Sequence, residues 1–516
     1  MSIPRLSAVL SCFALVIAGA LTTGPSGAVA DPGDPVGKVT SSRAEARDAL
    51  VEARAVLTGR AAPGTDATMA LLQLWRLRDA LSPADRAAAD QLLARPDTTQ
   101  SACTADNCYH WTTGGTDGVP ATDADADGVP DYVETVMASV DGVHDTYVAA
   151  GYRAPKADGL LGGNAKTDIY LEDVGSDSLY GYCTTDMELP PDTTTYDAWA
   201  YCVLDNDYSA AQFPTNTPLE NLQVTAAHEY FHAVQFAYDS YEDRWLMEAT
   251  ATWAEDQLFD DVDDNLQYLT DSPLTKPGQP LDTFTDGAGP QYGDWIFFRF
   301  LTEMLPDAEG GLPTLVRDVW DRADGAAGGS DEYSIQAVEG VLAERGVSLP
   351  RAYALFATVN RAPALWYEEG AANHYPSSGP AATVKLTKSK KDSGWRRASL
   401  LHLSSITVRF MPGTGLSSTA WKLKVNLDLP DTSTGSAAAV TVYKRSGAPQ
   451  VTIVPLSSSG AATRKVAFGS RGVRYVEVSM VNAGTRYSCW TSGAYSCQGS
   501  SLDDGRKVLV RATAVK

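Results

Sequence analysis

Apolar residues recur at helical spacing over residues 31–98, where they alternate with Arg and Asp. The positions that keep this spacing include Met69, Leu71, Leu72, Leu74, Trp75, Leu77 and Leu81. Ser82 and Pro83 have the form of an N-cap followed by proline in the first helical turn, and they open a last helix that runs to Leu93. The pattern predicts two or three helices, which form either a propeptide or an accessory helical segment.

The next part of the chain, residues 99–375, mixes strand-like and helical periodicity. Strand-like runs cover 108–113, 167–171 and 198–204. Apolar positions at helical spacing occupy 132–150 and 295–301. We therefore expect an α+β body.

The pattern changes again in residues 376–516, where short β-rich runs alternate with Gly, Ser, Pro and Thr. These runs cover 405–410, 421–427, 439–443, 474–481 and 508–512. Short strands at such spacing are typical of a β-sandwich, so this region is predicted to be a separate domain.

Residues 1–30 have the features of a signal peptide. Arg5 is the single charged residue among them, an uncharged apolar run covers 6–21, and small residues follow at 28–30. The run is shorter than the roughly 20 residues that a membrane-spanning helix needs, and no second run of that length follows. We expect a protein that is exported, extracellular and without a transmembrane anchor.

Length and charge support this division. A chain of 516 residues is too long for one ordinary core. The formal net charge of -23 argues against nucleic acid as a main partner, because binding phosphates requires a basic surface. Residues 376–516 nevertheless carry 20 Lys and Arg against 6 Asp and Glu. This basic module is expected to lie against the acidic body or against an anionic surface such as a cell wall; a solvated charged face is the simpler alternative.

Six cysteines remain once the predicted signal peptide is removed. They fall into short-range pairs, Cys103 with Cys108, Cys183 with Cys202 and Cys489 with Cys497. Three local disulfides fit an exported protein. A zinc site made of cysteines is disfavoured because no Cys-x-x-Cys spacing occurs.

The most informative motif is HExxH at residues 228–232, in a chain with only six histidines. Thr217 and Pro218 have the form of a helix start, and no Gly or Pro follows before the motif ends. Four residues turn a helix by about 400°, so His228 and His232 share a face and can bind one metal ion. Glu229 lies beside them, where it can act as a base toward a water at the metal.

A catalytic zinc site needs a third protein ligand. The helix predicted to follow a polar turn at 239–244 offers Glu248 and Glu255, which are seven residues apart and so share a face. In an antiparallel helix pair Glu248 lies nearer the turn than the histidines and Glu255 slightly farther from it, so depth does not decide between them. Spacing alone leaves both candidates open.

The sequence resembles a known family at these residues. HExxH followed by Trp-Leu-Met-Glu-Ala at 245–249 resembles the gluzincin pattern, and residues 105–305 are similar to exported bacterial zinc metallopeptidases of the peptidase MA-like type. The resemblance implies a zincin-like fold in which Glu248 is the third zinc ligand and Glu255 orients a ligand imidazole. It also places Tyr292 as a phenol donor to the oxyanion. The shorter spacing between His232 and Glu248 and the absence of Gly-x-Met-Glu-Asn separate this chain from the aminopeptidases of that superfamily.

We therefore expect a secreted zinc metallopeptidase that hydrolyses peptide bonds in a protein or peptide substrate, with Glu229 as general base. The alternative is a non-catalytic cell-surface binding protein that keeps a zincin scaffold for stability. Glu229 favours the peptidase, because a scaffold without activity needs no base beside the metal.

A second cation site is predicted at residues 123–134, which match a 12-residue calcium loop. Its expected ligands are Asp123, Asp125, Asp127, the carbonyl of Val129, Asp131 and Glu134. Carboxylates that converge without a cation repel one another, so we expect a structural Ca²⁺; the alternative is a solvated acidic turn. A helix is expected after the loop but not before it.

Overall fold

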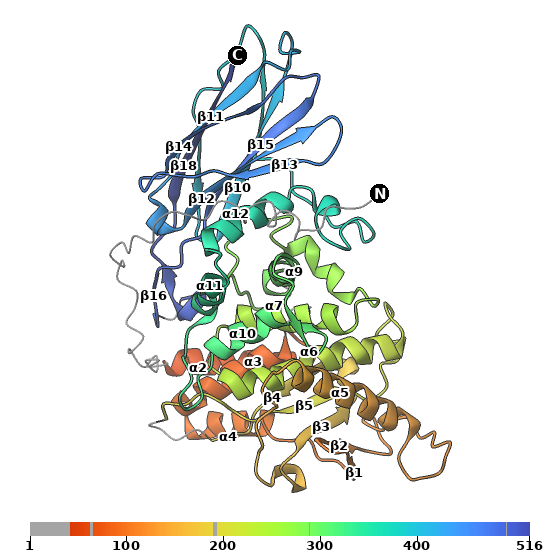
Figure 1. The fold of residues 1–516 in the computed structure, drawn as a ribbon. Helices are drawn as coiled ribbons and strands as arrows, with labels where there is room; N and C mark the ends of the chain where they lie inside the picture. The colour runs from red at the N-terminus through yellow and green to blue at the C-terminus, as the bar shows by residue number, and fades with distance from the viewer. Residues whose placement is uncertain (1–41, 62–65, 189–192, 288, 492) are drawn as a thin grey trace.

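The computed structural model describes residues 42–61, 66–188, 193–287, 289–491 and 493–516. The predicted signal peptide lies outside these residues. Figure 1 shows a mixed helical and β body below a β-rich C-terminal domain, with the N-terminal helices packed on the body. The coarse α/β architecture and the β-rich C-terminal region are as expected, while the finer prediction of a zincin-like fold stays a prediction.

Three helices form the N-terminal helical segment, which we define as residues 42–93: α2 (Arg43–Val56), α3 (Ala67–Leu77) and α4 (Pro83–Leu92). Ser82 caps α4 with Pro83 in its first turn, as the sequence predicts, and Ser42 caps α2. Leu71 and Trp75 of α3 are buried in the hydrophobic core shared with the body. The segment is thus an integral layer of the fold.

The body contains a five-stranded sheet in the order β1-β2-β3-β5-β4. Its strands are β1 (Gln100–Cys103), β2 (Asn107–Trp111), β3 (Thr167–Glu172), β4 (Gly181–Thr184) and β5 (Tyr201–Asp205). The central strands β2, β3 and β5 run parallel, and the edge strands β1 and β4 pair antiparallel to them. The expected strands at 108–113, 167–171 and 198–204 correspond to β2, β3 and β5.

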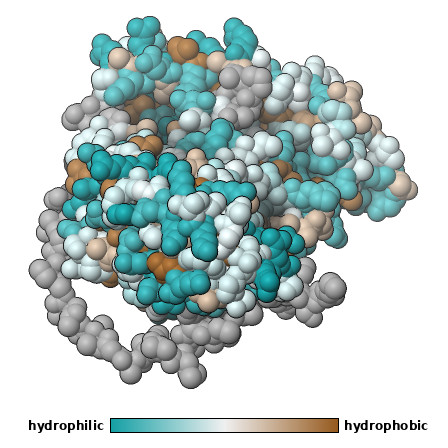
Figure 2. Space-filling model, turned by 90° about the horizontal axis from the view of Figure 1, so that it is seen from above, coloured by the Kyte–Doolittle hydropathy of each residue, from teal (hydrophilic) through white to brown (hydrophobic). Residues whose placement is uncertain are grey.

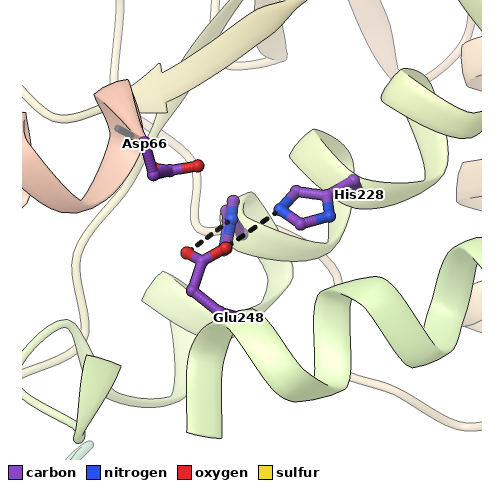
Figure 3. A group of neighbouring side chains, drawn as sticks. Asp66, His228 and Glu248 are labelled. Atoms are coloured by element: carbon purple, nitrogen blue, oxygen red, sulfur yellow. Dashed lines mark ion pairs between the residues drawn. The ribbon is translucent and has the colours of Figure 1, made fainter. Parts of the chain in front are cut away.

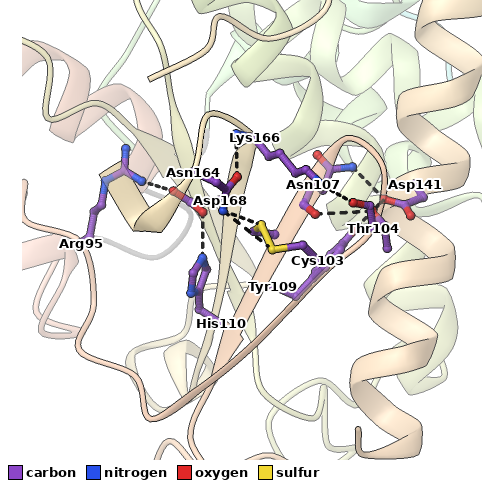
Figure 4. Close-up of a disulfide and its surroundings, with 11 residues drawn as sticks. Arg95, Cys103, Thr104, Asn107, Tyr109, His110, Asp141, Asn164, Lys166 and Asp168 are labelled. Carbon is purple, nitrogen blue, oxygen red and sulfur yellow. Dashed lines mark hydrogen bonds and ion pairs between the residues drawn. A yellow bond between two sulfur atoms is a disulfide. The ribbon is translucent and has the colours of Figure 1, made fainter. Parts of the chain in front are cut away.

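All three predicted disulfides are present, joining Cys103 to Cys108, Cys183 to Cys202 and Cys489 to Cys497. Figure 4 shows the first, which closes the β1–β2 hairpin. Beside it Asn107 and Tyr109 donate hydrogen bonds to Asp141 on α5 (Asp131–Ala149), at 2.8 and 2.6 Å. These bonds fasten the hairpin to the helix that covers it.

Helices make up the rest of the body. They are α6 (Pro218–Asp239), α7 (Arg244–Leu258), α8 (Pro290–Gly293), α9 (Trp295–Met304), α10 (Thr314–Arg322), α11 (Ser334–Glu344) and α12 (Leu349–Val359). A short two-stranded ribbon, β6 (Ala308–Glu309) and β7 (Leu312–Pro313), precedes α10. No helix in the described part of the chain is long and apolar enough to cross a membrane.

The C-terminal domain consists of two sheets with a hydrophobic core between them. One sheet has the order β13-β12-β15-β10-β8, with β8 (Ala382–Leu386), β10 (Ser404–Pro412), β12 (Ser436–Lys444), β13 (Gln450–Ile453) and β15 (Val473–Asn482). The other has the order β14-β11-β18-β9, with β9 (Arg396–Leu400), β11 (Lys422–Asp428), β14 (Ala461–Ala467) and β18 (Arg506–Val515). A small hairpin of β16 (Tyr487–Ser488) and β17 (Ser500–Ser501) lies between β15 and β18 in the chain.

The sequence pattern located the five inner strands of these two sheets and missed the four outer ones. The missed strands β8, β9, β13 and β14 are the edges of the sheets. Most of their residues are partly or fully exposed, so the alternation of apolar and polar residues is weak there.

The basic domain packs on the acidic body, which was one of the two arrangements expected for it. Helix α12 lies against β12 and β15, and Arg361 forms an ion pair with the buried Glu477 at 3.2 Å. Figure 2, seen from the end of the molecule that the C-terminal domain occupies, shows a mostly hydrophilic face with scattered apolar side chains.

Candidate metal centre

The HExxH motif lies on α6, which is buried along most of its length. Thr217 and Glu220 form a capping box at its start, with Pro218 in the first turn. The helix packs against β4 and β5, and a tight turn returns the chain along it as α7. This antiparallel pair presents His228, His232 and Glu248 to the same point between the helices. Figure 3 shows two of them, His228 and Glu248, facing each other.

Distances among the ligand atoms fit a single metal ion. His228 Nε2 lies 3.4 Å from one Glu248 carboxylate oxygen, and His232 Nε2 lies 3.5 Å from the other. A carboxylate oxygen of Asp66 joins this group, in which the four ligand atoms all lie within 4.8 Å of one another. Two imidazoles and carboxylate oxygens form a donor set that zinc binds tetrahedrally.

Four polar atoms at this point are buried and have no hydrogen-bond partner: His228 Nε2, His232 Nε2 and both oxygens of Glu248. Burying a polar atom without a partner costs about 1–3 kcal/mol, so such atoms are rare in folded proteins. A cation at this point would coordinate these atoms. The residues therefore fit a zinc ion.

The structure separates the roles of the two candidate glutamates. Glu248 approaches the Nε2 atoms, whereas Glu255 Oε1 accepts a 2.6 Å hydrogen bond from the Nδ1 atom of His228, on the other side of the ring. That bond fixes the tautomer of His228 and leaves Nε2 free for a metal. Glu248 therefore lies among the candidate ligand atoms and Glu255 behind His228, while their roles toward a metal stay predictions.

Gln235 does the same for the second histidine and was missed in the sequence. Its Oε1 lies 2.7 Å from Nδ1 of His232, and its side-chain amide donates to the carbonyl of Met247 at 2.9 Å. The signal was available, because residue 235 follows His232 by three positions and so lies on the same face of α6.

Glu229 lies beside the centre, where its Oε2 accepts a 3.0 Å hydrogen bond from the hydroxyl of Thr68. Burial, with the charges of Asp66 and Glu248, raises the pKa of Glu229 to about 8, although His228 opposes the shift. Burial and the charge of Asp66 likewise raise the pKa of Glu248 to about 8. A cation bound beside these buried carboxyl groups would stabilise their ionised forms.

Tyr292, in α8, also reaches the centre. Its ring lies 6.4 Å from that of His228 and stacks on Tyr268 at 4.9 Å. Its hydroxyl donates a hydrogen bond to Asp66 at 3.1 Å. The phenol thus lies beside the group of candidate ligand atoms.

Asp66 is the member of the group that sequence analysis did not predict. It comes from the N-terminal helical segment, where its carboxylate caps α3 through the backbone N–H of Met69 at 2.7 Å. In the sequence it has only the features of an N-cap, and no spacing rule connects it to a motif 162 residues later. Only the packing of α3 against β4 and the body brings it to the histidines.

The predicted calcium loop forms a compact turn at the start of α5. Carboxylate oxygens of Asp123, Asp125 and Asp127 lie within 4.8 Å of one another. Asp131, at the first position of α5, accepts a 2.9 Å hydrogen bond from the backbone of Ala124. The chain enters the loop from β2 through irregular structure, as expected.

Asp131 and Glu134, which the sequence predicts as ligands, are not part of this group of converging carboxylates. Gly128 has a φ of 96°, the left-handed region that favours glycine at the turn. The backbone N–H of Val129 donates to Asp127 at 2.8 Å. Slight burial and the carboxylates of Asp125 and Asp127 raise the pKa of Glu134, which places that side chain in the negative field of the loop.

Comparisons with known proteins add little. No model of a known protein family matches the chain, and no curated protein matches it. Among solved structures it is similar to a family GH115 4-O-methyl-α-glucuronidase with specificity for decorated arabinogalactans, at 11% identity and a TM-score of 0.14. That match covers 71% of this chain and 54% of the glucuronidase, so the chain spans about half the length of that protein. A similarity this weak carries no argument.

Proposed function

We propose that the protein is an exported, zinc-dependent peptidase that hydrolyses peptide bonds in a protein or peptide substrate. One observation carries the proposal: four buried atoms of His228, His232 and Glu248 converge without hydrogen-bond partners, next to a buried carboxylate, Glu229, that is not among the ligands. Three protein ligands and an adjacent carboxylate are what hydrolysis at a zinc ion requires.

Each residue has a distinct role. Zinc bound here would polarise the substrate carbonyl and lower the pKa of a water molecule to about 7. Glu229 accepts the proton of that water and passes it to the leaving amine. Tyr292 donates its hydroxyl hydrogen to the carbonyl oxygen as negative charge develops there. Glu255 and Gln235 hold the two imidazoles in the orientation that keeps both Nε2 atoms directed at the metal.

The rival proposal, a non-catalytic binding protein on the same scaffold, explains the ligands but not Glu229. A carboxylate that is 6 % exposed and has its pKa raised to about 8 is costly to bury, and the ligand set does not need it. A scaffold kept only for stability would be more stable with an apolar residue there. This position therefore favours the peptidase.

The test compares metal content and hydrolysis in matched variants of the exported protein. Glu229→Gln is expected to keep about one zinc per chain and to lose hydrolysis of an unstructured protein substrate by 100-fold or more, since general-base catalysis contributes about 10²–10⁴-fold. Glu248→Ala is expected to lose the zinc. Full turnover by Glu229→Gln would remove Glu229 from the mechanism and favour the rival proposal.

We also propose that the loop at 123–134 binds a structural Ca²⁺. In addition to the converging carboxylates, Asp123 Oδ1 is buried without a hydrogen-bond partner, which is the condition that a cation would relieve. Calcium is expected to raise the melting temperature of the exported protein, and Asp125→Asn is expected to reduce that rise.

For the C-terminal domain we propose contact with an anionic surface such as a cell wall. Lys422, Lys465 and Lys507 are exposed on neighbouring strands β11, β14 and β18. Cosedimentation with purified cell walls that falls steeply with added salt is the expected result. Binding that three Lys→Glu changes leave unaltered would contradict it.

A further inference from the structure

The metal centre and the N-terminal helical segment are not independent parts of the molecule. We propose that Asp66 is a fourth ligand of the metal, and that the segment carrying it keeps the proposed peptidase latent until the segment is displaced. This inference rests on the proposed function, because it concerns the same metal ion.

The number of protein ligands distinguishes an open zinc site from a closed one. A catalytic zinc keeps three protein ligands and one position for water, whereas four protein ligands make a closed site. Asp66 supplies a carboxylate oxygen within 4.8 Å of the ligand atoms of His228, His232 and Glu248. Figure 3 shows its carboxylate reaching from α3 toward Glu248. With Asp66 in place, the position that a water needs is taken.

The first turn of α3 also forms hydrogen bonds with the two groups proposed to act on the substrate, Tyr292 and Glu229. Tyr292 donates its hydroxyl to Asp66, so the proposed oxyanion donor is already bonded. Thr68, two residues further on, donates its hydroxyl to Glu229 and thereby occupies the proposed base.

Thr68 makes a second contact, with the edge of the body sheet. Its hydroxyl oxygen accepts a 2.9 Å hydrogen bond from the backbone N–H of Cys183 in β4, which is an edge strand. Edge strands bind extended peptides through such free backbone groups. One turn of α3 therefore covers the metal, the base, the oxyanion donor and a backbone group suited to holding a peptide.

The rest of α3 holds this turn in place. Trp75 donates its indole N–H to the carbonyl of Met187 at 2.7 Å, and Arg76 donates to the carbonyls of Ser240 and Glu242 at 2.7 and 3.0 Å. The last two carbonyls belong to the connection between α6 and α7, the helices that carry the ligands. The segment is thus anchored to the part of the body that it blocks, and substrate access requires its displacement.

The experiment uses the full chain loaded with Co²⁺, whose visible spectrum reports coordination and does not depend on activity. Acetohydroxamate, a small metal-binding probe, is titrated into the unaltered protein and into Asp66→Asn. Asparagine is as good an N-cap as aspartate but lacks the negative charge that a fourth ligand supplies, so α3 stays capped. We expect the cobalt spectrum to change in Asp66→Asn and the probe to bind at least about tenfold more tightly than in the unaltered protein.

Two control variants separate metal coordination from helix stability. Ser82→Ala removes the cap of the neighbouring helix α4, and Thr68→Val frees Glu229 without touching the metal; neither is expected to change the cobalt spectrum. Equal probe affinity in the unaltered protein and Asp66→Asn, with cobalt bound in both, overturns the latency proposal and leaves the proposed peptidase standing. If the unaltered protein does not bind cobalt, or if its cobalt binding does not require His228, the proposed metal centre is wrong.

Discussion

Two buried clusters of histidine and carboxylate in this molecule use the same residue types and differ in completeness. In the cluster between body and C-terminal domain, His402 Nε2 bonds Asp282 at 2.8 Å and His402 Nδ1 bonds Asp504 at 2.6 Å. Asp282 also accepts hydrogen bonds from Tyr487 and Ser496. In the HExxH cluster, two imidazole nitrogens and both oxygens of Glu248 are buried without partners.

The difference indicates what each cluster is for. The Asp282–His402 cluster satisfies its own polar atoms and joins two domains, so it needs nothing further to be stable. The HExxH cluster leaves four of its buried polar atoms without hydrogen-bond partners, and the residues that carry them converge on one point. Buried polar atoms that are left without partners and share a direction indicate a ligand, whereas a histidine beside a carboxylate does not by itself.

The largest expected effect tests the base next to the incomplete cluster. With the N-terminal helical segment displaced from the body, so that a substrate can reach the site, Glu229→Gln should lower kcat for peptide hydrolysis by about 10²–10⁴-fold without loss of zinc, because the carboxylate that accepts the proton is gone. The measurement is turnover of a fluorogenic peptide, with zinc determined on the same samples. A decrease of less than about tenfold would assign the base to another residue.

The second prediction compares one substitution in each of the two clusters. Asp282→Ala leaves a buried histidine and two hydroxyl groups without their partner and should lower the free energy of unfolding by about 3–5 kcal/mol, with zinc content unchanged. Glu248→Ala should abolish zinc binding. Chemical denaturation and elemental analysis of both variants check the pair. Zinc loss in Asp282→Ala would show that unpartnered polar atoms do not distinguish a metal-binding cluster from a structural one.

The third prediction concerns the acidic loop, in which one buried atom, Asp123 Oδ1, has no hydrogen-bond partner. Calcium at about 100 times its dissociation constant should stabilise the protein by about 2.7 kcal/mol through binding to the folded state alone. The measurement is the free energy of unfolding with calcium and with a chelator of calcium. Magnesium at the same concentration is the control, and equal stabilisation by both ions would contradict a calcium loop.

The smallest effect is a pH dependence in the complete cluster. Burial lowers the pKa of His402, but Asp282 and Asp504 outweigh this and leave it above its ordinary value. A raised histidine pKa contributes stability below the unfolded value of about 6.5, and that contribution is lost as pH rises through the folded pKa. The difference in unfolding free energy between the unaltered protein and His402→Asn should therefore shrink from pH 6 to pH 9. A difference that grows over this range would contradict the assignment.

Periodicity predicted the helices that carry the candidate site and the inner strands of the C-terminal sheets, but not α10, α11 or α12. The helix at 218–239 and the helix that returns along it were predicted because their caps and uninterrupted runs are local features. The outer strands of the C-terminal sheets were not, because an exposed edge has no buried face to impose alternation.

Some residues of the candidate site could likewise be predicted from local spacing, whereas others depend on tertiary packing. His228, Glu229 and His232 follow from helical spacing, and Glu248 and Glu255 from a second helix beside the first. Deciding between the two glutamates required the antiparallel packing, which sets which one reaches the Nε2 atoms. Asp66 was beyond prediction, since its place depends on contacts between segments far apart in the chain.

The most direct test of the account is the zinc content of the purified protein, measured by elemental analysis for the unaltered chain, Glu248→Ala and Glu255→Gln. The account predicts about one zinc per chain in the unaltered protein, loss in Glu248→Ala, and weakened but detectable binding in Glu255→Gln, which only orients His228. An unaltered protein that cannot be loaded with zinc, or a Glu248→Ala variant that holds it as firmly, would contradict the account.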